Sequence, residues 1–248
     1  MAMPLIASAQ NDAFKRLLSL TASKGLRKEG LFLLSGEKLI REFLARPNLK
    51  IVHELIGPHM QPTLRTGDAS LLQFSAELFA QLDVLGTDFN ILVLEQPQAP
   101  ALTSADLENH APRGIEVVLP VGDPGNLGAL LRSCEAFGVS RVILTREAAH
   151  PFLPKAVKAS AGSALRLPLA HGPALGEFPV SCIALDSGGA PIEDFKWPDN
   201  GLLVVGEEGQ GLPPRFKQRV SIPTQGVESL NAVVAASIAL FCKARARR

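Results

Sequence analysis

The feature that most constrains the fold of this chain is the alternation of short apolar runs with helix-like stretches after residue 114. Strands that alternate with helices along a chain pair in parallel, and helices then cover both faces of the sheet. We therefore expect an α/β unit with a largely parallel sheet. The predicted strands are residues 115–121, 141–144, 182–185, 202–205 and 220–222, and the predicted helices are residues 127–137, 154–159 and 230–244.

The first 95 residues predict a second, smaller α/β domain. A segment that is rich in proline and poor in large apolar residues, residues 96–113, follows it and predicts a linker. The expected division is therefore a domain at 1–95, a linker at 96–113 and a domain at 114–248. Within the first domain we expect helices at 11–20, 36–45 and 75–82, strands at 31–34, 51–56 and 91–95, and a basic loop at 21–30.

A tight turn that runs into a helix, DPGNLGALLRSCEAFGV at residues 123–139, is the first candidate site. Pro124 and Asn126 are turn residues, and Arg132 lies off the apolar stripe of the helix that follows. A strand that ends at a helix N-terminus is a common place for ligands, so Asn126 and Arg132 are expected to share a site. The alternative interpretation is a helix cap followed by an exposed arginine.

Two further polar loops follow predicted strands. GEEGQGLP at residues 206–213 carries Glu208, and its glycines match neither a dinucleotide fingerprint nor a phosphate loop. IPTQGVESLNAVVAAS at residues 222–237 carries Ser229 and Asn231. A plain turn and a helix cap are the alternatives, but one binding crevice at the carboxyl ends of parallel strands explains all three loops together.

These three segments resemble, in the same order, the three signature motifs of the SpoU/TrmH RNA 2′-O-methyltransferases of the SPOUT superfamily. The segment PKAVKASAGSALRLP at residues 154–168 also resembles that family. Residues 14–44 resemble the L30e-like RNA-binding extension that some of its members carry at the N-terminus. The resemblance covers most of residues 114–245.

The resemblance implies a trefoil-knotted α/β domain, S-adenosylmethionine as cofactor, and a homodimer. The positions that it assigns to the cofactor are Leu144, Gly206, Ile222 and Leu230. The positions that it assigns to catalysis are Asn126, Arg132, Glu208, Ser229 and Asn231.

A ribose 2′-hydroxyl is a weak nucleophile, and the implied chemistry therefore needs a positive charge near the attacking oxygen. Arg132 can stabilise the developing alkoxide and hold a neighbouring phosphate through its planar fork. Because a guanidinium hardly deprotonates in proteins, we expect an electrostatic role for Arg132 and not that of a base.

The basic residues near the N-terminus predict contacts with RNA phosphates, above all Lys24, Arg27 and Lys28. The resemblance of the first domain to a ribosomal protein favours large-subunit (23S-type) ribosomal RNA as the substrate. Transfer RNA is the alternative substrate, and an RNA-binding relative that has lost catalysis is the alternative function.

The cysteines and histidines are scattered and predict neither disulfides nor a metal site. Cys134, Cys182 and Cys242 lie in separate apolar segments, which favours buried and reduced thiols. Neither a signal peptide nor a membrane-spanning apolar run is found in the sequence. We expect a cytoplasmic protein.

Overall fold

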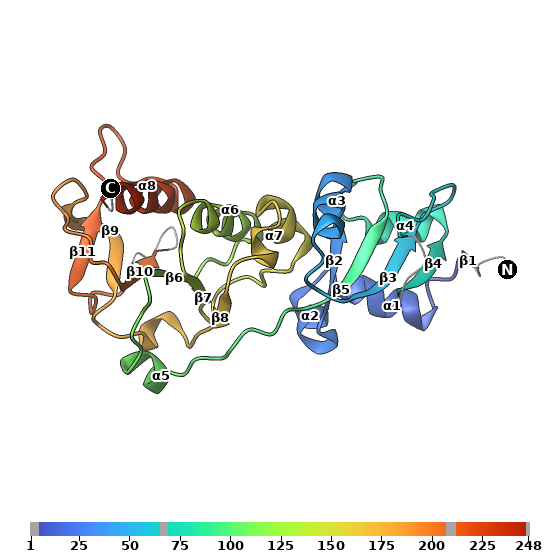
Figure 1. Cartoon of the computed structure of the whole chain (residues 1–248), viewed down its shortest axis with the longest axis horizontal. Helices are drawn as coiled ribbons and strands as arrows, with labels where there is room; N and C mark the ends of the chain where they lie inside the picture. The colour runs from blue at the N-terminus through green and yellow to red at the C-terminus, as the bar shows by residue number, and fades with distance from the viewer. Residues whose placement is uncertain (1–4, 65–68, 207–211, 247–248) are drawn as a thin grey trace. The chain divides into compact units, whose positions relative to one another are not determined.

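The computed structural model describes residues 5–64, 69–206 and 212–246. The chain folds into two compact units (Figure 1). Met1–Gln98 and His150–Gly162 form the first unit, and Ala99–Ala149 and Ser163–Arg248 form the second. The backbone therefore passes between the units three times.

The first unit has a five-stranded mixed sheet in the order β1-β4-β3-β5-β2. β4 pairs in parallel with β1 and β3, and β5 pairs antiparallel to β3 and β2. Its strands are β1 (Leu5–Ile6), β2 (Leu31–Ser35), β3 (Ile51–Ile56), β4 (Ser70–Phe74) and β5 (Ile91–Glu95). Its helices are α1 (Asp12–Ser19), α2 (Ser23–Glu29), α3 (Glu37–Ala45), α4 (Ala76–Leu82) and α7 (Pro154–Ala159).

The prediction of a basic loop at residues 21–30 is wrong, because most of this segment is the helix α2. Its sequence has too few apolar residues to show a helical period, but Leu26 is fully buried and fixes it against the unit. A Cβ atom at Gly25 would lie 2.0 Å from the carbonyl oxygen of Ser19. Glycine therefore allows the close approach of α2 to the end of α1.

The segment that carries α7 packs with the first unit although its neighbours in the sequence belong to the second. The ring of Phe152 stacks on that of Phe32 in β2, with 4.8 Å between the ring centroids. Both side chains are buried, as are Ala156 and Val157 of α7. The core of the first unit thus includes residues from the middle of the chain.

The second unit has a six-stranded sheet in the order β11-β9-β10-β6-β7-β8, and each of its pairings is parallel. The predicted parallel α/β architecture is confirmed. Its strands are β6 (Ile115–Leu119), β7 (Arg141–Leu144), β8 (Leu169–His171), β9 (Ile183–Pro191), β10 (Gly201–Val205) and β11 (Gln218–Ser221). Its helices are α5 (Ser104–Glu108), α6 (Pro124–Ala136) and α8 (Ala232–Ala246), with short 3-10 helices η1 (Ser163–Leu165) and η2 (Leu175–Glu177).

Helices cover both faces of this sheet (Figure 1). Leu107 of α5 belongs to an apolar cluster with Val118, Ile143 and Val204, which are buried side chains of three adjacent strands. α6 and α8 lie side by side over the other face. The helix α5 falls within the predicted linker, and the trefoil knot stays a prediction.

Candidate functional site

Two helix N-termini carry two of the predicted catalytic residues. Asp123 caps α6, since its Oδ1 accepts the backbone N–H of Asn126 at 2.8 Å, and Pro124 opens the helix. Asn231 caps α8, because its Oδ1 accepts the backbone N–H of Val233 at 3.0 Å. Asn231 therefore acts as a cap, as the alternative interpretation proposed.

The two helices run in the same direction and are in register. The hydroxyls of Ser133 and Ser237 lie 2.7 Å apart, and one turn further on the rings of Phe137 and Phe241 meet edge to face at 6.0 Å. The second pair lies four residues after the first in both helices, which shows that the helices are parallel. The N-termini of α6 and α8, with their two asparagines, therefore lie at the same end of the helix pair.

A cavity of about 350 Å³ opens where β10 and β11 end and α8 begins. Its apolar wall comprises Leu185, Val205, Leu212, Ile222 and Leu230, with Ala232 and Ala235 from α8. Its polar edge comprises Asp186, Ser187, Thr224, Glu228 and Ser229. At Gly206, which also lines the cavity, a Cβ atom would lie 3.2 Å from Cγ of Leu212, so a larger residue would crowd the wall.

Four of the nine residues predicted for the cofactor and for catalysis meet in this cavity. They are Gly206, Ile222, Ser229 and Leu230. Leu144, Asn126, Arg132 and Asn231 do not line it. Glu208 falls outside the described residues.

Leu144 is separated from the cavity by the strand order. It is the last residue of β7 and is buried. In the sheet, β6 lies between β7 and β10, which carries Val205 at the cavity. Adjacent strands are about 4.8 Å apart, so Leu144 is roughly 10 Å from β10.

Arg132 lies on the exposed side of α6, immediately before Ser133, whose hydroxyl contacts α8. Among the described residues, no acidic or carbonyl group pairs with its guanidinium. The side chain is thus available to an anionic ligand.

Asp186 was not predicted as a site residue, although it lies directly after the predicted strand 182–185 in the sequence DSGG. Its Oδ2 forms an ion pair with Arg219 at 2.7 Å, and its Oδ1 accepts the backbone N–H of Gly188 at 2.9 Å. Burial alone would raise the pKa of this carboxyl, but these bonds outweigh burial and lower it. A carboxylate is therefore held at the edge of the cavity.

Arg219 also organises the backbone that follows the Glu208 loop. Its guanidinium donates to the carbonyl oxygens of Pro213 at 2.7 Å, Phe216 at 3.1 Å and Leu212 at 3.4 Å. Because Leu212 lines the cavity, Arg219 and Asp186 together hold one part of its wall.

The predicted RNA-binding residues share one exposed helix face in the first unit. Lys24, Arg27 and Lys28 are exposed on α2 at spacings of three and four residues, which places them on the same side of a helix. Glu29 pairs with Arg16 at 2.6 Å and lies 3.8 Å from Lys28. The charge of this face is therefore only partly compensated.

The cysteines are free thiols, and the predicted burial is confirmed for Cys134 and Cys182 but is wrong for Cys242. Cys134 and Cys182 are buried, and burial raises the pKa of each thiol to about 12. Cys242 is only partly buried. Within the described segments, no helix is long and apolar enough to cross a membrane.

The model of the SpoU rRNA Methylase family matches residues 115–241, just over half of the chain. A 23S rRNA (guanosine(2553)-2′-O)-methyltransferase of Bacillus subtilis is 28% identical over 256 residues, which cover 96% of this chain and 98% of that protein. The crystal structure of an AdoMet-bound rRNA methyltransferase from Sinorhizobium meliloti superposes with a TM-score of 0.79 at 25% identity, covering 98% of both chains.

A longer relative is more similar in sequence. A protein of Syntrophobacter fumaroxidans that is named ribosomal RNA small subunit methyltransferase G 2 is 37% identical over 246 residues, which are 97% of this chain and 49% of that protein. The chain spans about half the length of several curated relatives that it matches.

Proposed function

Because the chain belongs to the SpoU rRNA Methylase family, we propose that it transfers a methyl group from S-adenosylmethionine to a ribose 2′-hydroxyl of RNA. The observation that carries this proposal is the cavity at the ends of β10 and β11. Gly206, Ile222 and Leu230, three of the four positions that the resemblance assigns to the cofactor, converge in its wall.

The cavity fits S-adenosylmethionine in size and in chemistry. A volume of about 350 Å³ lies within the range of small-molecule sites, about 300–1,000 Å³. The apolar wall suits a flat base, and the polar edge offers acceptors to an ammonium group and to sugar hydroxyls. Gly206 keeps the wall open, because a side chain there would meet Leu212.

In the proposed mechanism Arg132 acts on the RNA. The bound cofactor supplies an electrophilic methyl group on a sulfonium. Arg132, exposed on α6, stabilises the negative charge that develops on the attacking ribose oxygen and holds the adjacent phosphate. Since the guanidinium stays protonated, the ribose proton passes to another acceptor or to solvent.

The remaining residues of the assigned set position these groups. Asn126 and Asn231 lie at the starts of the parallel helices α6 and α8, and Ser229 lies in the cavity wall. We propose that they orient the ribose and the loops, and that Glu208 orients Arg132. Leu144 remains a proposed cofactor contact on the resemblance alone.

We propose ribosomal RNA of the large subunit as the substrate and the cytoplasm as the compartment. The exposed basic face of α2 supports binding to a structured RNA, and the Bacillus subtilis relative, which has nearly the same length, is named for 23S rRNA. The small-subunit name belongs to a protein of which this chain matches 49%. Transfer RNA remains the alternative substrate.

We further propose that the chain forms a homodimer through α8. Val234 and Phe241 of this helix are 48% and 46% exposed, which leaves large apolar side chains in contact with water. Burial of such a helix face against a second copy would remove this area from solvent. Analytical ultracentrifugation measures the oligomeric state directly.

The experiment that tests the proposed function is methyl transfer from labelled S-adenosylmethionine to unmodified ribosomal RNA and transfer RNA in parallel, followed by mass spectrometry of the nucleosides. We expect the label in a 2′-O-methylnucleoside of large-subunit RNA. Label in transfer RNA alone would establish the alternative substrate, and bound cofactor without transfer to either pool would favour a non-catalytic relative.

In the same assay, Arg132→Ala should reduce methyl transfer by about 10²–10³-fold, the usual loss when one charge-stabilising group is removed. Its affinity for S-adenosylmethionine, measured by calorimetry, should stay within about twofold of the wild type, because Arg132 does not line the cavity. Arg132→Lys keeps the charge without the planar fork and should recover only part of the activity. Loss of cofactor binding in Arg132→Ala would contradict this role.

A further inference from the structure

The charged side chains at the cavity edge indicate which ligand charge the cavity favours. Of the described lining residues, only Asp186 and Glu228 are charged, and both are acidic. Lysine, arginine and histidine are absent from this lining. The cavity therefore presents negative charge to its ligand.

The two carboxylates differ in their neighbours. The charge of Asp186 is compensated by the guanidinium of Arg219 at 2.7 Å. Glu228 has no ion pair or hydrogen bond to another described residue, and it lies in the exposed loop between β11 and α8. Among the described lining residues, Glu228 thus supplies the uncompensated negative charge.

The loop geometry holds Glu228 near this place. The hydroxyl of Thr224 donates to the carbonyl oxygen of Val227 at 2.8 Å, which closes a turn in which Gly226 has a φ of 77°. Asn231 fixes the start of α8 three residues after Glu228. The carboxylate therefore lies between two anchored backbone segments.

Methyl transfer changes the charge of the ligand that this cavity is proposed to hold. A C–O bond forms at the ribose oxygen and the C–S bond breaks, its electron pair remaining on sulfur, while the hydroxyl proton passes to another acceptor or to solvent. A sulfonium with a net charge of +1 thereby becomes a neutral thioether. A fixed negative charge at the cavity distinguishes these two species, although they are nearly identical in shape.

We propose that Glu228 is a specificity-determining residue that favours the cationic S-adenosylmethionine over its neutral product, S-adenosylhomocysteine. This inference rests on the proposed function and concerns the same cavity. The negative charge of Glu228 attracts the cationic methyl donor. Once the methyl group has left, the ligand is neutral and this attraction is gone. Product release follows from a change in ligand charge without a change in the protein.

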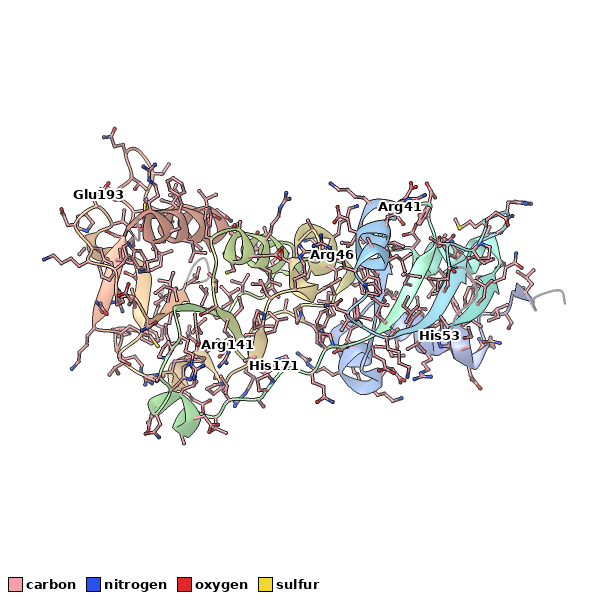
Figure 2. The ribbon with its side chains drawn as sticks, in the orientation of Figure 1. Arg41, Arg46, His53, Arg141, His171 and Glu193 are labelled. Carbon is pink, nitrogen blue, oxygen red and sulfur yellow. The ribbon has the colours of Figure 1, made fainter. Side chains whose placement is uncertain are left out.

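The test is calorimetric binding of three ligands to Glu228→Gln: S-adenosylmethionine, its cationic amine analogue sinefungin, and neutral S-adenosylhomocysteine. A charge pair at a partly exposed site, screened by salt, corresponds to about three- to tenfold in affinity. Both cationic ligands should weaken by this factor, and S-adenosylhomocysteine should be unchanged. Glu193→Gln is the matched control, since Glu193 (labelled in Figure 2) is exposed in the same unit and does not line the cavity.

Equal weakening of all three ligands would show a role in shape and would overturn the inference, as would no change in any of them. The wild type gives a second test that needs no variant: raising the salt concentration should weaken S-adenosylmethionine and leave S-adenosylhomocysteine unaffected. A wild-type chain that binds none of the three ligands would overturn the proposed function itself, and the inference with it.

Discussion

Two carboxylate–arginine pairs in the second unit have nearly the same shortest distance between nitrogen and oxygen but different surroundings. Asp186 and Arg219 lie 2.7 Å apart, with side chains 17% and 21% exposed. Glu135 of α6 and Arg166 lie 2.6 Å apart, with side chains 34% and 48% exposed. The first pair forms part of the cavity edge, whereas the second fastens α6 to the backbone that follows η1.

The difference shows that distance alone does not measure what an ion pair contributes. Arg219 also satisfies three backbone carbonyl oxygens, so its removal leaves several partly buried polar groups without partners. Arg166 donates to both carboxylate oxygens of Glu135, at 2.6 and 2.8 Å, and the hydroxyl of Ser163 donates to Glu135 at 2.6 Å. This pair is nevertheless more exposed to solvent, and exposed pairs contribute about 0–1 kcal/mol. Connectivity and burial make the Asp186 pair the more important one.

The largest effect is expected for Arg219→Ala. Loss of the ion pair and of three hydrogen bonds should lower the free energy of unfolding by about 2–4 kcal/mol. Because Leu212 and Asp186 line the cavity, the affinity for S-adenosylmethionine should also fall. Urea unfolding measures the stability and calorimetry measures the affinity. An unchanged affinity would show that the Asp186–Arg219 pair does not shape the cavity.

A smaller effect is expected for Arg166→Ala. The free energy of unfolding should fall by about 0.5–1 kcal/mol, as is usual for an exposed pair, and the affinity for S-adenosylmethionine should not change. The same two measurements serve here. A loss of stability equal to that of Arg219→Ala would refute the distinction that we draw between the two pairs.

The smallest effect concerns pH. The pKa of Asp186 is lowered despite burial by the bonds from Gly188 and Arg219, and the pKa of Glu135 is lowered chiefly by its hydrogen bond from Arg166. A lowered pKa stabilises the fold above the ordinary carboxyl pKa, about 3.9 to 4.3, and this stability is lost as the pH falls through the folded-state pKa.

The stability advantage of the wild type over Asp186→Asn should therefore hold at pH 7 and pH 5 and decrease below about pH 4. Glu135→Gln should show the same direction with a smaller amplitude. Chemical unfolding at pH 7, at pH 5 and below about pH 4 measures the stability difference for both variants. A difference that grows as the pH falls would contradict the sign.

Much of the second unit could be predicted from sequence because its strands are buried on both faces. Continuous apolar runs such as residues 115–119 and 202–205 are apparent without tertiary information. β8 was missed because only three residues pair. α5 was missed within the predicted linker because it is five residues long and depends on the Thr103–Asp106 capping box.

Site residues that follow one another closely along the chain could be predicted. A residue that joins the site only through the order of strands in the sheet could not. Gly206 follows β10, and Ile222 and Leu230 lie between β11 and α8, so these elements are consecutive in the sequence. The three residues meet at one cavity. Asp186 joins them because β9 lies between β10 and β11 in the sheet, an order that the spacing of the strands along the chain does not reveal. In the first unit, α2 was missed because burial of Leu26, and not helical periodicity, determines that helix.

The stacking of Phe152 on Phe32 bears on how the chain is made. During synthesis β2 leaves the ribosome early. Phe152, which completes this part of the core, emerges only after β6 and β7 of the second unit. The N-terminal unit therefore cannot reach its final packing while it is the only part outside the exit tunnel. For the same reason, a protease that cuts once between residues 98 and 99 leaves residues 150–162, a part of the first unit, on the C-terminal product.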